Sequence, residues 1–189
     1  MADAVGRFFL AAPLPQSLKN YLAQLQRIVR GQLSQPLRWV KPEGMHLTLK
    51  FIGDFERARL KELEEALKLG LAGKPTLSLA LSRLGAFPDA RKARVLWVGL
   101  EGDIEPLAEL AVACDELTAK LGVAPEQKKY SAHLTLARAA GQEFAYLEEL
   151  VAKAQVEPLA FPVAEVQLIE SQLRPGGSLY KLVCDFPLG

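Results

Sequence analysis

Hydrophobic residues recur at the spacing of an α-helix in four parts of the chain. In residues 15–30 they fall three or four positions apart, and Gly31 follows at the predicted end of the helix. The same pattern occurs in three further segments: 56–69, 103–121 and 142–154. These segments predict amphipathic helices that each bury one face against a core.

Shorter hydrophobic runs lie between the helices and predict β-strands. The first run covers residues 7–12 and ends at Pro13. Further runs occur at 46–54, 76–84, 94–100, 133–138, 161–171 and 179–186. An Arg-Pro-Gly-Gly sequence at 174–177 predicts a turn between the last two strands.

The order strand, helix, strand, helix, strand occurs twice along the chain, which indicates an internal duplication with pseudo-twofold symmetry. No linker rich in Gly, Ser or Pro separates the two halves. The sequence therefore predicts one domain, 1–189, of two lobes at approximately 7–87 and 94–186. The predicted fold class is α+β, a bilobal fold in which two helix-backed, mostly antiparallel sheets face a central cleft.

The chain has only two histidines, and each begins the tetrapeptide His-Leu-Thr-Leu. Side chains alternate between the faces of a strand, so His46 and Thr48 point the same way, roughly 7 Å apart. His133 and Thr135 repeat this arrangement. If a twofold axis relates the lobes, the two His-Thr faces meet across the cleft.

Two imidazoles and two hydroxyls that face each other suit phosphodiester chemistry. Histidine titrates near pH ~6.5, so one ring can accept a proton while the other donates one. Threonine hydroxyls can donate hydrogen bonds to phosphate oxygens, on which charge develops in the transition state. No covalent nucleophile is required.

Two other interpretations of the histidines are open. A single histidine in a strand is more often a packed residue than a catalyst, but two matching motifs in a repeat favour catalysis. A zinc site is the second alternative, because histidine commonly binds zinc. Asp54 is the only acidic candidate near either motif, and Cys114 and Cys184 are distant in sequence. We therefore predict no metal.

At these motifs the chain resembles the 2H phosphoesterase superfamily, which is named for two His-x-Thr/Ser-x motifs on pseudo-symmetric lobes. Within it the chain is similar to the RNA 2′,3′-cyclic phosphodiesterases, historically called 2′–5′ RNA ligases. The segments that carry the resemblance are RFFLAAPLP, WVKPEGMHLTLKFIGD, GAFPDARKARVLWVGL, YSAHLTLAR and ESQLRPGGSLYKLVCDFPL. They span nearly the whole chain.

The resemblance implies hydrolysis of a terminal 2′,3′-cyclic phosphate to a 2′-phosphomonoester, with weak reversible 2′–5′ ligation and no metal or other cofactor. It assigns His133 as the proton acceptor and His46 as the proton donor. It assigns Thr48 and Thr135 to the phosphate. The partner is an RNA with a cyclic phosphate end or a nucleoside cyclic phosphate.

The resemblance also implies a phosphate contact by Arg138 and an aromatic residue near the cleft, Phe9. By alternation Arg138 would point away from His133, so this role requires a bulge or a strand end near Ala137. The family usually has proline before the second histidine, where this chain has Ala132.

Two basic residues are further candidates for substrate binding. Lys50 lies on the same strand face as His46 by simple alternation. Arg94 begins a predicted strand after a basic loop, at a position that matches the family. A basic loop is also compatible with a solvated surface.

Charge and hydrophobicity limit the class of protein. The net charge is +1, so an RNA substrate requires a local basic patch. Two cysteines do not form a disulfide framework, and no hydrophobic run is as long as a membrane span. We therefore expect a cytoplasmic, monomeric protein that does not bind membranes. A non-catalytic module that binds RNA ends or phosphate is the alternative to an enzyme.

Overall fold

The computed structural model describes residues 4–33, 35–141, 144–174 and 177–189. Its helices are α1 (Gln16–Gly31), α2 (Leu60–Leu71), α3 (Ile104–Ala119) and α4 (Glu148–Lys153), with short 3-10 turns at Pro42–Gly44 and Arg57–Arg59. Its strands are β1 (Val5–Pro13), β2 (Leu37–Trp39), β3 (His46–Glu56), β4 (Leu77–Phe87), β5 (Val95–Gly102), β6 (His133–Ala139), β7 (Ala160–Val163), β8 (Glu165–Arg174) and β9 (Gly177–Pro187).

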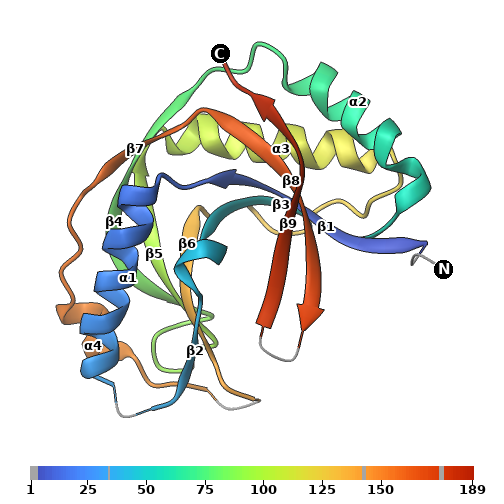
Figure 1. Cartoon of the computed structure of the whole chain (residues 1–189). Coiled ribbons are helices and arrows are strands. Elements are labelled where there is room, and N and C mark those ends of the chain that lie inside the picture. The colour runs from blue at the N-terminus through green and yellow to red at the C-terminus, as the bar shows by residue number, and fades with distance from the viewer. Residues whose placement is uncertain (1–3, 34, 142–143, 175–176) are drawn as a thin grey trace.

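The strands form two antiparallel sheets (Figure 1). The four-stranded sheet has the order β3-β1-β8-β9, and the five-stranded sheet has the order β2-β6-β5-β4-β7. The first His-Leu-Thr-Leu motif begins β3, and the second begins β6. Each motif therefore belongs to a different sheet, as expected for two sheets that face a central cleft.

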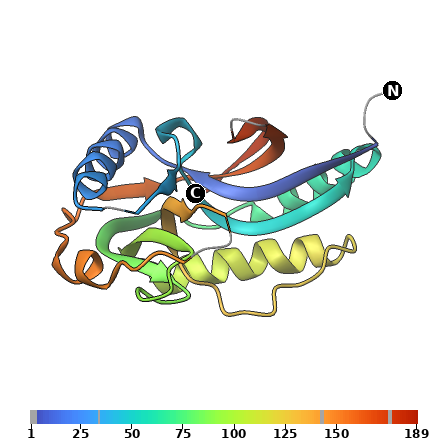
Figure 2. The same ribbon diagram turned by 90° about the horizontal axis from the view of Figure 1, so that it is seen from below.

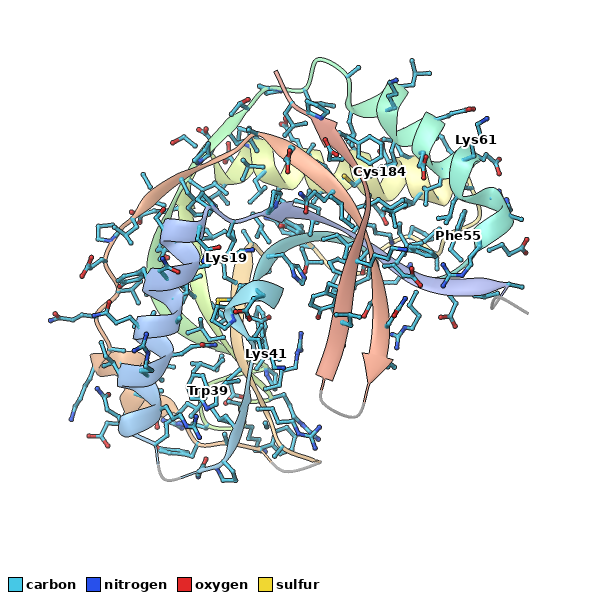
Figure 3. All side chains as sticks on the ribbon, in the orientation of Figure 1. Lys19, Trp39, Lys41, Phe55, Lys61 and Cys184 are labelled. Carbon is cyan, nitrogen blue, oxygen red and sulfur yellow. The ribbon has the colours of Figure 1, made fainter. Side chains whose placement is uncertain are left out.

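One hydrophobic core connects the helices to both sheets. Helix α3 packs against α2 and contacts both β3 and β4, and Figure 2 shows it alongside the long strands β1 and β3. Helix α1 buries one stripe of its surface, formed by Leu18, Leu22, Leu25 and Val29. Cys184 on β9, labelled in Figure 3, packs against the same core. The helices thus hold the two motif strands in fixed positions.

Two predicted elements differ from the structure. The helix predicted at 142–154 is limited to α4 among the described residues, because Ala145 forms a β-bridge with Ala93; residues 142–143 lie outside the described residues. The strand predicted at 161–171 divides into β7 and β8, which belong to different sheets. Of the turn predicted at 174–177, residues 175–176 lie outside the described residues.

The two sheets do not each consist of one half of the chain. Strand β4 from the first half joins β5 and β6, while β8 and β9 from the second half join β1 and β3. Strands from both predicted halves thus contribute to each sheet, and the division into lobes at approximately 7–87 and 94–186 stays a prediction. Sheet pairing does not follow chain order here: β1 pairs antiparallel with β8, although the two strands lie near opposite ends of the chain. The duplication itself stays a prediction.

Candidate active site

A cleft of about 240 Å³ lies where the two motif strands approach each other. Both predicted His-Thr pairs line it, together with Arg138 and Phe9. The other lining residues are Arg7, Phe8, Val40, Gly44, Met45, Phe51, Gly53, Ser171 and Tyr180. The volume is smaller than that of most sites that enclose a whole drug-sized ligand. It suits the terminal part of a larger substrate.

The two histidines have the same local geometry. The ring Nδ1 of His46 is 2.8 Å from the carbonyl oxygen of Gly44, and Nδ1 of His133 is 2.8 Å from that of Ser131. A carbonyl oxygen only accepts, so Nδ1 carries a hydrogen in both rings. In the neutral form Nε2 is then the unprotonated nitrogen and can accept a proton from a ligand in the cleft.

Aromatic rings cover His46 on two sides. The Phe9 ring centroid is 4.7 Å from the imidazole centroid, and the Tyr180 ring meets the imidazole edge-on at 5.2 Å. Burial, with a smaller contribution from the positive charges of Lys19 and Arg138, lowers the pKa of His46 to about 4, although the hydrogen bond to Gly44 acts in the opposite direction. His46 is therefore neutral near pH 7 when the cleft is empty.

His133 lies against a second pair of aromatic residues. Phe87 meets its ring edge-on with 4.9 Å between centroids, and the Trp97 ring lies 6.3 Å away. Burial lowers the pKa of His133, and the charge of Arg138 acts in the same direction. Both rings are thus neutral in the empty cleft, so the proton donor must gain its proton when an anion binds.

Arg138 reaches the cleft through a β-bulge. Leu96 pairs with Ala137 and Trp97 pairs with Thr135, so Leu136 is the extra residue on β6. This irregularity reverses the alternation after Thr135 and turns Arg138 toward the cleft. The bulge that the sequence predicted near Ala137 is therefore confirmed.

A buried glutamine holds the bulge. Gln26 Nε2 donates to the carbonyl oxygens of Leu136 and Val40, at 2.9 and 2.8 Å. The Val40 N–H also donates to the Leu136 oxygen, at 2.9 Å. Helix α1 is thereby attached to the bulge of β6 and to the segment that leads into His46.

Lys50 does not face the cleft, and this prediction was wrong. Leu10 pairs with Lys50 and Ala11 with Thr48, so Leu49 is a bulge residue that reverses the alternation of β3. The Lys50 side chain is only 2% exposed, and its Nζ lies 2.6 Å from Asp115 Oδ1 on α3. It is part of the packing between strand and helix.

Arg94 is also absent from the cleft lining. Its Nη1 donates to the carbonyl oxygen of Gly141 at 3.1 Å, and its guanidinium lies 4.4 Å above the Phe144 ring. The next residue, Val95, pairs with Arg138 and shares its face, so alternation turns Arg94 to the other side. The Arg94 side chain instead contacts Gly141 and Phe144 outside the cleft, and its assignment as a substrate-binding candidate is corrected.

Phe9 lines the cleft but is only 3% exposed. A ring covered to this extent cannot offer its face to a nucleobase, and its neighbour is the ring of His46. Phe51, on the same sheet, is 59% exposed and lies 6.2 Å from Phe9. Sequence reasoning missed Phe51, because simple alternation gives its place in the cleft to Lys50.

Tyr180 and Tyr130 were also missed. Tyr180 lies on β9, more than a hundred residues from His46, and nothing in the sequence indicates that the two rings meet. The Tyr130 hydroxyl donates to the carbonyl oxygen of Thr48 at 2.9 Å. This bond attaches the segment before the second motif to the first motif strand.

Within the described residues, no group of three or more His, Cys, Asp or Glu side chains could hold a metal ion. Asp54, the acidic candidate for a zinc site, lies 3.9 Å from Arg7. None of the helices in the described ranges is long and apolar enough to cross a membrane.

The LigT-like phosphoesterase family model matches the chain twice, at residues 12–97 and 98–180. The chain belongs to this family. The two matches together cover most of the sequence, and each contains one of the two His-Leu-Thr-Leu motifs.

Two curated members of the family illustrate the similarity. The RNA 2′,3′-cyclic phosphodiesterase of Methanothermobacter thermautotrophicus is 34% identical over 92% of this chain and 94% of that protein. The RNA 2′,3′-cyclic phosphodiesterase of Aquifex aeolicus is 34% identical over 80% of this chain and 82% of that protein.

Solved structures share the fold. TT0787 of Thermus thermophilus matches with a TM-score of 0.81 and 24% identity, over 96% of this chain and 97% of that one. LigT of E. coli, complexed with 3′-AMP, matches with a TM-score of 0.78 and 22% identity, over 97% and 98%. The predicted bilobal α+β phosphoesterase fold is confirmed.

Proposed function

We propose that this protein hydrolyses the 2′,3′-cyclic phosphate at the end of an RNA to a 2′-phosphomonoester. The single observation that carries the proposal is the pair of histidines in one cleft, each with Nδ1 donating to a backbone carbonyl and with a threonine beside it. The family and its curated RNA 2′,3′-cyclic phosphodiesterases support this substrate.

In the proposed reaction His133 Nε2 accepts a proton from water, and the water oxygen attacks phosphorus. The bond between phosphorus and the 3′-oxygen breaks, and His46 donates a proton to that oxygen. Thr48, Thr135 and Arg138 stabilise the charge on the non-bridging oxygens. Attack by the 5′-hydroxyl of a second RNA in place of water would break the same bond to the 3′-oxygen and form a 2′–5′ linkage, and the reverse of that step would restore the cyclic phosphate.

The bound phosphate would supply the charge that the donor requires. Burial is the main cause of the low pKa of His46 in the empty cleft, and repulsion from Arg138 adds to it; an anion next to His46 offsets both effects and favours the protonated form. A histidine with a low pKa is a weak base and, once protonated, a strong acid. This supports His46 as the proton donor.

The direct test uses an RNA that ends in a 2′,3′-cyclic phosphate, with identification of the product. We expect a 2′-phosphomonoester, and losses of ~10²-fold or more in kcat for His46→Ala and His133→Ala. Exhaustive chelation should leave the rate unchanged. A protein that binds the RNA without turnover would instead be the alternative, a non-catalytic RNA-end binding module.

The order of the two histidines has its own test. A substrate with an activated leaving group needs no proton on the departing oxygen, so it should partly rescue His46→Ala but not His133→Ala. Rescue of His133→Ala alone would reverse the assignment.

A cytoplasmic location and a monomeric state stay predictions.

A further inference from the structure

A row of four residues crosses the face of the five-stranded sheet that carries the second motif. Arg38 on β2 pairs with Arg138 on β6, which pairs with Val95 on β5, which pairs with Phe87 on β4. Residues directly opposite in an antiparallel pair share a face, with Cβ atoms about 5 Å apart. Because Arg138 lines the cleft, Arg38 extends the cleft surface outward by one strand.

The neighbours of Arg38 on β2 support this orientation. Leu37 and Trp39 are partly buried and pack against the hydrophobic core, whereas Arg38 is exposed. Alternation therefore places Arg38 on the opposite side from the core. Figure 1 shows β2 beside β6, at the edge of the sheet.

The two arginines form an unfavourable pair in the absence of an anion. Like charges directly opposite each other destabilise a sheet. Within the part of the chain that the structure describes, neither the Arg38 nor the Arg138 side chain has a hydrogen-bond or ion-pair partner, whereas the side chains of Arg59 and Arg91 each pair with a glutamate. Two adjacent guanidiniums without a carboxylate are a site prepared for more than one phosphate charge.

The size of the cleft limits the part of a substrate that Arg38 can contact. About 240 Å³ accommodates the terminal cyclic phosphate and its ribose, so the preceding nucleotides of an RNA must lie outside. Neighbouring strands are ~4.8 Å apart, so Arg38 lies next to Arg138, on the edge strand β2 and outside the cleft lining. A single-stranded RNA carries one phosphate charge per nucleotide at this exit.

We infer that Arg38 binds the phosphodiester immediately 5′ of the terminal cyclic phosphate, while Arg138 binds the cyclic phosphate itself. This inference rests on the proposed function and extends it to a subsite for the RNA backbone. It predicts that the protein prefers a cyclic phosphate on an RNA chain to one on a single nucleoside. A backbone contact of this kind carries no base preference.

The test compares two substrates that differ only in the upstream phosphodiester: adenosine 2′,3′-cyclic phosphate and adenylyl-adenosine 2′,3′-cyclic phosphate. For Arg38→Gln we expect the ratio of the two kcat/KM values, dinucleotide over mononucleotide, to fall about tenfold. The salt dependence of log kcat/KM for the dinucleotide should also become shallower, by about 0.7 per lost phosphate contact.

Arg30→Gln is the matched control. Arg30 is an exposed arginine in the last turn of α1, and its replacement removes the same charge from another surface. We expect the wild-type ratio in this variant. Equal losses on both substrates in Arg38→Gln would place Arg38 on the cyclic phosphate, and an unchanged ratio would show no upstream contact. Either result overturns the inference.

Failure of the proposed function would be visible separately, because wild-type protein would then hydrolyse neither substrate. In that case the subsite is tested by binding, with the fluorescence anisotropy of a labelled adenylate trinucleotide that ends in a 3′-phosphate. Arg38→Gln should bind this probe about tenfold more weakly than Arg30→Gln. Equal affinities in the two variants would overturn the inference without any reference to turnover.

Discussion

At the scale of single residues, two histidines with identical backbone contacts have different surroundings. Each Nδ1 donates to the carbonyl two residues before it in the chain, which fixes the same tautomer in both rings. His46 packs against Phe9 and Tyr180, whereas His133 lies against Phe87 and Trp97. The shared contact follows from the repeated motif, and the different burial follows from the neighbouring elements.

The low pKa of His46 predicts a pH-dependent stability. Its pKa falls from 6.5 to about 4 on folding, so between these pH values the unfolded chain binds the proton more readily. The stabilising contribution is complete above pH ~6.5 and is lost as the pH falls toward ~4. We expect wild-type protein to lose up to about 2 kcal/mol more unfolding free energy than His46→Gln between pH 7.5 and pH 5.

Urea unfolding at the two pH values measures this difference. His133→Gln is the control, and it should retain the greater part of the wild-type pH dependence because His46 is still present. If wild-type protein and His46→Gln lost the same free energy of unfolding, the His46 ring would not be desolvated in solution.

At the scale of the elements, one bulge in each motif strand decides which side chain enters the cleft after the threonine. The bulges at Leu49 and Leu136 occupy equivalent positions in β3 and β6. After the bulge, β3 turns Lys50 toward α3 and Phe51 toward the cleft. On β6 the equivalent cleft position is occupied by Arg138. The cleft therefore has an aromatic wall and a cationic wall, although the motifs are identical.

The corrected position of Lys50 predicts a structural effect. Its Nζ contacts Asp115 at 2.6 Å and the Ala124 carbonyl oxygen at 2.8 Å, and Asp115 is 20% exposed. Lys50→Ala leaves these partners without a cation and should reduce the free energy of unfolding by about 3 kcal/mol. Chemical denaturation measures the loss.

Lys61 on α2, labelled in Figure 3, provides the control. Its side chain is exposed, so Lys61→Ala should change the free energy of unfolding by less than about 0.5 kcal/mol. Folded Lys50→Ala should retain most of its affinity for phosphate. A Lys50→Ala variant that is fully stable but no longer binds phosphate would instead indicate that Lys50 contacts the substrate.

At the scale of the whole molecule, the last strand completes the environment of the first motif. Tyr180 on β9 lies edge-on to His46 and also closely approaches Gly44, where an added Cβ would be 3.3 Å from the tyrosine ring. Gly44 provides the carbonyl to which His46 donates. Gly44 and Tyr180, which are far apart in the sequence, therefore both contact the His46 imidazole.

Removal of the Tyr180 ring should expose His46 to water. Because burial is the largest cause of its low pKa, Tyr180→Ala should raise the pKa of His46 from about 4 toward its ordinary value. An NMR titration of the histidine ring protons measures the change, with His133 as an internal reference. Leu179→Ala on the same strand is the control, since Leu179 is exposed and absent from the cleft lining. An unchanged His46 pKa in Tyr180→Ala would contradict this account.

The sequence by itself determined most of the elements and the composition of the site. Helical and strand periodicities predicted α1, α2, α3 and the two motif strands, and part of the segment predicted as a helix at 142–154 forms α4, because local hydrophobic patterns reflect which face is buried. The repeated tetrapeptide predicted that His46, Thr48, His133 and Thr135 line one cleft, which the structure confirms. The sequence also indicated that β6 needs a bulge. Simple alternation points Arg138 away from His133, whereas the phosphate contact implied by the resemblance requires it to point toward the cleft.

Only the tertiary structure decided which residues complete the cleft. Lys50 was assigned to the wrong face because a bulge depends on the register with the neighbouring strand, and one strand's sequence does not contain that register. The exchange of strands between the halves, Tyr180 beside His46 and Arg38 beside Arg138 all join residues far apart in the chain. A local hydrophobic pattern indicates that a side chain is buried, but it does not identify the residues that cover it. Contacts across the sheets are therefore fixed only when the whole chain packs together.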